Sequence, residues 1–108
     1  MSGLSTHVLD AVSGKPAVGI RVALFSATDG EISTAATDGD GRVAELLSGP
    51  IDSGTYRLSF DTGQYFEQLG TPTFYPEVSI SFTVTDPLAH YHVPLLLSPF
   101  AYSTYRGS

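Results

Sequence analysis

The segment Val78-Ser-Ile-Ser-Phe-Thr-Val-Thr85 decides the fold, because apolar and hydroxyl side chains alternate along it without a break. A period of two places one kind of side chain on each face of a β-strand. The same alternation occurs at residues 20–24 and 56–60. A strand with one apolar and one polar face is typical of antiparallel sheets that pack one face on a core.

Turn sequences separate these strands at short intervals. The turns are Ser13-Gly-Lys-Pro16, Asp29-Gly30, Asp38-Gly-Asp-Gly41 and Asp86-Pro87. One stretch lacks the alternation, and its Asp61 cap followed by Gln64 predicts a single short helix. Tyr65 and Leu69 would then share one side of that helix. We therefore predict an all-β protein, a two-sheet β-sandwich of seven to eight strands with one short helix.

The composition indicates one domain over residues 1–108 and excludes several functions. The chain has no cysteine, so it forms neither disulfides nor thiolate metal sites. Its net charge is −6 and its five basic residues are scattered, which argues against binding to nucleic acid. No apolar run reaches the roughly 18 residues of a membrane span, and no secretory leader is evident. We expect a cytoplasmic protein.

The three histidines lie near the two ends of the chain, which suggests that function brings these ends together. His7 shares a strand face with Ser5 and Leu9 by parity. The alternate residues 91, 93, 95 and 97 are apolar or aromatic and should fill the core, so His90 and His92 should point outward. Pro94 and Leu96 also lie on that outward face. Exposed apolar surface usually marks an interface, so we expect an oligomer whose subunits meet over the histidines.

The chain resembles the transthyretin-related family, and within it the branch that hydrolyses 5-hydroxyisourate. Three blocks carry the resemblance, and together with the turn spacing and the lone helix they extend it over essentially the whole chain. These blocks are Leu4-Ser-Thr-His-Val-Leu-Asp10, Gly41-Arg42, and Tyr91-His-Val-Pro-Leu-Leu-Leu-Ser-Pro99 with the ending Tyr105-Arg-Gly-Ser108. The resemblance implies a transthyretin-like sandwich and a homotetramer, a dimer of dimers with sites at the dimer–dimer interface.

The resemblance also implies a reaction and a set of site residues. The reaction is hydrolysis of the N1–C6 ring amide of 5-hydroxyisourate, without cofactor or metal, to 2-oxo-4-hydroxy-4-carboxy-5-ureidoimidazoline in urate breakdown. Histidine has a pKa suited to a general base, and arginine is a permanent cation for a developing oxyanion. The implied catalytic residues are His7, Arg42 and His92. The implied substrate-binding residues are Tyr105, Arg106, Gly107 and Ser108, with His90, Leu96 and Ser103 as accessory residues and Tyr105 projecting into the tetramer channel.

Other interpretations of the same residues remain open. The protein could be a transthyretin-like carrier of a small hydrophobic ligand, or a structural domain of that fold without activity. The three histidines could form a zinc site, although no carboxylate lies within two residues of His90 or His92. The segment Asp38–Gly41 resembles the start of a calcium loop, but it lacks the closing glutamate and is better explained as a hairpin turn.

Overall fold

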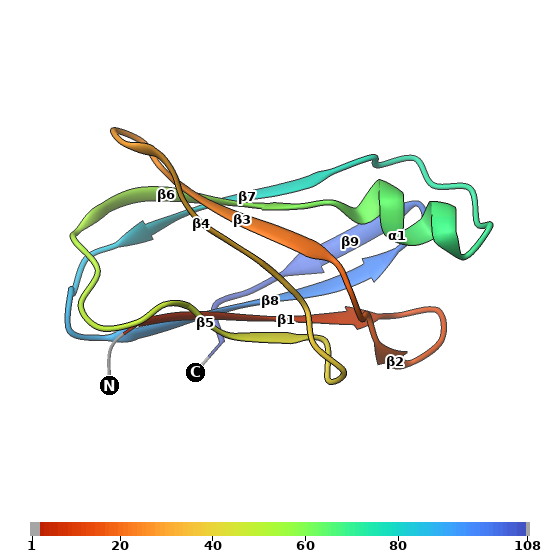
Figure 1. Cartoon of the computed structure of the whole chain (residues 1–108), viewed down its shortest axis with the longest axis horizontal. Coiled ribbons are helices and arrows are strands. Elements are labelled where there is room, and N and C mark those ends of the chain that lie inside the picture. Colours follow the sequence, from red (N-terminus) through yellow and green to blue (C-terminus); the bar gives the residue numbers. More distant parts are fainter. Residues whose placement is uncertain (1–2, 108) are drawn as a thin grey trace.

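The computed structural model describes residues 3–107, which fold into two β-sheets packed face to face (Figure 1). The described residues contain nine strands, so the predicted count of seven to eight is too low, the shortest strand having only two residues. The strands are β1 (Gly3–Asp10), β2 (Lys15–Pro16), β3 (Arg21–Ser26), β4 (Gly30–Ala36), β5 (Arg42–Leu47), β6 (Gly54–Phe60), β7 (Val78–Val84), β8 (His90–Ser98) and β9 (Ala101–Thr104).

The order of strands in each sheet places the two ends of the chain side by side. One sheet has the order β2-β1-β8-β9, and β5 joins it by pairing with β1. The other sheet has the order β4-β3-β6-β7. All pairs are antiparallel except β1 with β8, which run parallel from Gly3 and His90 to Asp10 and Leu97. This parallel pair places β1, near the N-terminus, beside β8, near the C-terminus. The two ends of the chain therefore lie together, as predicted.

The alternation seen in the sequence determines which side chains form the core. On β7, Val78 and Val84 are buried, while the serines and threonines between them face solvent. On β8, residues 91, 93, 95 and 97 are buried, as expected, but Pro94, which was expected on the exposed outward face, is buried as well. The core is closed by the apolar faces of both sheets and includes Leu4, Val8, Ile20, Val22, Leu24, Leu58, Phe60, Phe66, Tyr91, Val93, Leu95 and Leu97.

The predicted helix is present as α1 (Thr62–Gln68), at one end of the sandwich (Figure 1). The Asp61 side chain caps it by accepting a hydrogen bond from the Gln64 backbone N–H at 3.3 Å. Thr62 and Phe66 are its buried residues, and Tyr65 packs partly buried against the core, whereas Leu69 is 56% exposed. Phe66 enters the core and Leu69 lies at the C-terminal end of the helix, where the chain turns away.

Within residues 3–107, no helix has the length and apolar character needed to cross a membrane.

Candidate active site

Three adjacent strands place His7, Arg42 and His92 on the outer face of the first sheet. His7 pairs with Arg42 across the antiparallel β1–β5 pair, and directly paired side chains project from the same face. On the other side of β1, Ser5 pairs with His92 of β8, two positions from His7 along the strand. The predicted catalytic residues therefore come together, although they are far apart in the sequence.

A tight turn fixes the start of β5 and hence the position of Arg42. Gly41 has a φ of +74°, and a Cβ there would lie 2.5 Å from the Val8 carbonyl oxygen, so only glycine fits. The Asp38 carboxylate accepts hydrogen bonds from the backbone N–H groups of Asp40 and Arg42, at 2.9 and 3.0 Å. Both bonds lower the pKa of Asp38, and the bond from Arg42 has the larger effect. The segment is thus a hairpin turn, as predicted.

Ser5 lies between the two histidines of β8. Its Oγ is 2.8 Å from His92 Nδ1 and 2.9 Å from His90 Nε2, both hydrogen-bonding distances. The Ser5 side chain is itself buried at 8% exposure. Ser5 belongs to the block Leu4–Asp10 and was expected on the face of His7, but its contact with the two histidines was not predicted. Finding it required the register between β1 and β8.

The environment of His92 favours its neutral form. Burial lowers its pKa below the usual 6.5, and the neighbouring His7, His90 and Arg42 lower it further. A backbone hydrogen bond with Ser5 acts in the opposite direction. A neutral imidazole is the form that accepts a proton, so His92 is suited to act as a general base near neutral pH.

The C-terminal segment returns to His92 after β9. The Gly107 backbone N–H donates a hydrogen bond to the His92 carbonyl oxygen at 2.8 Å, which forms an isolated bridge between the two residues. A Cβ on Gly107 would lie 2.5 Å from Cδ2 of the His92 ring. The backbone of the tail therefore packs directly against the imidazole, and Ser108 lies outside the described residues.

Tyr105 and Arg106 lie at the edge of the sandwich. They line a cavity of about 310 Å³ together with His92 and Phe82, and the Arg106 guanidinium lies 4.8 Å from the centre of the Tyr91 ring. Tyr105 was expected on the last strand, but β9 ends one residue earlier, at Thr104. Its position in the tetramer channel therefore stays a prediction.

The predicted accessory residues divide into two groups. His90 contacts the site through Ser5, as described above. Leu96 pairs with Ser103 farther along the same sheet, and both line a shallow hollow with Ala101 and Ala11. This hollow contains none of the three predicted catalytic residues, so Leu96 and Ser103 lie beside the histidine cluster rather than in it.

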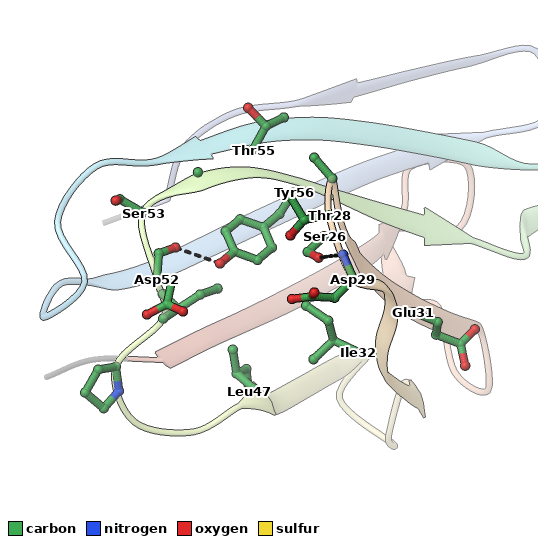
Figure 2. Close-up of a pocket in the computed structure, with 14 residues that line it drawn as sticks. Ser26, Thr28, Asp29, Glu31, Ile32, Leu47, Asp52, Ser53, Thr55 and Tyr56 are labelled. Atoms are coloured by element: carbon green, nitrogen blue, oxygen red, sulfur yellow. Dashed lines mark hydrogen bonds between the residues drawn. The ribbon is translucent and has the colours of Figure 1, made fainter.

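Two other possible sites lack the chemistry of the histidine face. Residues 3–107 contain no group of three or more histidine or carboxylate side chains placed to hold a metal ion, so the three-histidine zinc arrangement is not formed there. A cavity of about 620 Å³ opens elsewhere, with Asp29 and Asp52 on opposite sides and Ile32 and Leu47 beside them (Figure 2). Neither histidine nor arginine lines it.

Comparison with known proteins agrees with the class of protein that this fold defines, a transthyretin-like sandwich. The model of the HIUase/Transthyretin family matches residues 4–107. The 5-hydroxyisourate hydrolase of Salmonella dublin is 47% identical over 109 residues, covering 97% of this chain and 80% of that protein. The chain therefore belongs to the HIUase/transthyretin family.

Solved structures of both branches of the family superpose on this chain. The Klebsiella pneumoniae 5-hydroxyisourate hydrolase has a TM-score of 0.91 at 36% identity, covering 99% of this chain and 100% of that one. Transthyretin from Sparus aurata has a TM-score of 0.87 at 33% identity, with 99% and 97% covered. The fold alone thus does not separate hydrolase from carrier, and the side chains of the site must do so.

Proposed function

We propose that this protein hydrolyses 5-hydroxyisourate at the N1–C6 ring amide to give 2-oxo-4-hydroxy-4-carboxy-5-ureidoimidazoline. The observation that carries the proposal is the cluster of His7, Arg42 and His92 on one outer face, in a chain 47% identical to a 5-hydroxyisourate hydrolase. A carrier of an apolar ligand has no need for two histidines and an arginine at one place.

The chemistry requires a positioned water, a base and a cation. One histidine removes a proton from water, the water oxygen bonds to C6, and the C6 oxygen becomes an oxyanion. Arg42 stabilises that oxyanion, since its guanidinium stays charged and donates paired hydrogen bonds. The C6–N1 bond then breaks as N1 receives a proton from a histidine. C6 becomes the carbon of a carboxylic acid, which releases its remaining proton to solvent as a carboxylate forms.

We further propose that the reaction needs no metal ion and no cofactor. The ring amide of the substrate is electron-poor, so a base and an arginine supply the catalysis that it needs. Full activity after dialysis against a chelator is the expected result. Loss of activity that a divalent cation restores would contradict this part of the proposal.

We also propose that the domain acts as a homotetramer, a dimer of dimers that meets over the histidine face. The support is the apolar character of this face, where Leu9 and Leu96 lie partly exposed on the same side as the histidines. Sedimentation equilibrium should give about 46 kDa, four times the chain mass of 11.4 kDa. A mass of 11.4 kDa in the active sample would contradict the proposal.

The decisive experiment follows the ultraviolet decay of 5-hydroxyisourate generated in place by urate oxidase. The wild-type protein should accelerate the decay, and His7→Ala should abolish the acceleration. Ser59→Ala, which removes a strand serine in the other sheet, is the control and should behave as wild type. Decay at the spontaneous rate with the wild-type protein would reject the hydrolase, and binding of a hydrophobic ligand would then support the carrier.

A further inference from the structure

The contact of Ser5 with two histidines restricts where the ring protons can lie. A serine hydroxyl has one proton to donate, and it accepts hydrogen bonds through its lone pairs. With His92 Nδ1 at 2.8 Å and His90 Nε2 at 2.9 Å, Ser5 can donate to at most one ring, and every ring to which it does not donate must donate to it. The two histidines therefore share one hydroxyl as a hydrogen-bond partner.

Three arrangements satisfy the geometry, and they differ in which nitrogen of His92 carries the proton. In the first, His92 Nδ1–H donates to Ser5, and Ser5 donates to His90 Nε2, so His92 Nε2 carries no proton. In the second, His90 Nε2–H donates to Ser5 and Ser5 donates to His92 Nδ1, so the His92 proton lies on Nε2. In the third, both rings donate to Ser5 and the Ser5 proton points elsewhere. The first and third arrangements leave His92 with a basic Nε2.

One contact favours a proton on His92 Nδ1, and two further features of the site are compatible with it. The backbone of Ser5 forms a hydrogen bond that raises the pKa of His92, and only an acceptor of a ring N–H does so. Within residues 3–107, Nε2 of His92 has no hydrogen-bond partner, so it is available to water or substrate. Ser5 is also held rigidly, because β1 pairs with β5 on one side and β8 on the other.

We propose that Ser5 is a positioning residue that holds the proton of His92 on Nδ1, leaving Nε2 as the base, and that links His92 to the state of His90. The inference rests on the proposed hydrolase function and assigns the base that this function left open. When Nε2 takes a proton from the attacking water, His92 becomes an imidazolium and its Nδ1–H bond to Ser5 is retained. No proton or hydroxyl then has to reorient during the step.

The same link makes His90 an inhibitory proton site. When protonated His90 donates from Nε2 to Ser5 and the Ser5 proton is turned toward His92 Nδ1, the His92 proton lies on Nε2. The base is then lost even though His92 itself remains neutral. His7 and Arg42 also lower the pKa of His92, and Tyr105 and Arg106 line a cavity with it. Among the described residues, no hydrogen bond joins any of these four side chains to the Ser5 hydroxyl.

The first test compares Ser5→Ala with Ser5→Thr. Ser5→Ala should lower kcat about tenfold to a hundredfold with little change in KM. This loss is part of the rate acceleration of about 10²–10⁴-fold that a positioned general base contributes. Ser5→Thr keeps the hydroxyl on a strand residue and should restore most of the activity. Ser59→Ala in the other sheet should have wild-type kcat. A wild-type kcat in Ser5→Ala would overturn the proposal.

The second test measures the ring protons without substrate. Nitrogen-15 chemical shifts of His92 at about pH 8, above the usual histidine pKa, should show the Nδ1–H tautomer in wild type. The Nε2–H form should become populated in Ser5→Ala. An unchanged tautomer in that variant, whatever its activity, would show that Ser5 does not position His92. This outcome is separate from a failure of the hydrolase assay, which would reject the proposed function instead.

The third test uses a variant that leaves Ser5 in place. His90→Gln removes one titrating group but keeps an amide that can accept from Ser5. The acidic limb of log(kcat/KM) against pH should lose about one unit of slope, because one inhibitory proton has been removed. An acidic limb as steep as that of the wild type would overturn the link between His90 and His92.

Discussion

Replacement of Gly107 by alanine should separate activity from stability. The added Cβ would lie 2.5 Å from Cδ2 of His92, whereas ordinary contacts of this kind are 3.4–4 Å. The His92 ring or the tail must therefore move by about 1 Å. A displacement of about 1 Å in a catalytic group costs on the order of 10²-fold in rate. We expect kcat for 5-hydroxyisourate to fall by about that factor.

The fold should tolerate this change, because Gly107 is not in the left-handed region and lies outside the core. The assay is the ultraviolet decay of 5-hydroxyisourate, with thermal unfolding measured on the same samples. Gly39→Ala is the matched control, since a Cβ there meets no atom within 4 Å. If Gly107→Ala retains full kcat, the contact between the tail and His92 does not position the ring for catalysis.

Three further predictions follow from the site and the core. His92→Ala should lower kcat by about 10²–10⁴, the usual contribution of a general base, and Arg42→Ala by about 10²–10³, the usual contribution of an oxyanion donor. Both variants should keep the far-ultraviolet circular dichroism of wild type. Near-normal turnover in either variant would remove that residue from the mechanism. Because the pKa of His92 is lower in the folded chain, the unfolded chain binds more protons at this residue. The stability that His92 contributes is therefore present above pH 6.5 and is lost as the pH falls through the lowered pKa. Urea unfolding of wild type and His92→Ala across this range should show the difference, and parallel curves would contradict it. Tyr65→Phe removes the 2.8 Å hydrogen bond to the buried Asp10 carboxylate, so it should cost about 1–3 kcal/mol in urea unfolding and leave kcat unchanged. An unaltered midpoint would show that the two backbone N–H bonds to Asp10 suffice.

The outward histidine face could be predicted because side-chain parity is a local property of a strand. Once residues 91, 93, 95 and 97 are assigned to the core, His90 and His92 must point the other way. The same reasoning does not extend to the helix, where spacing alone does not say which side faces the core. Tyr65 and Leu69 fit the i, i+4 pattern, but packing against the sandwich buries Thr62 and Phe66.

The sequence by itself determined the β-sandwich, the helix cap at Asp61, the turn before Arg42 and the faces on which the histidines lie, because each depends on residues close together in the chain. Only the tertiary structure decided which residues from distant parts of the chain are in contact. Ser5 contacts His90 and His92 across 85 and 87 residues, and Gly107 returns to His92 by a bridge outside the regular strands. These contacts depend on the parallel register of β1 and β8, and the core packing that fixes this register comes from both sheets together.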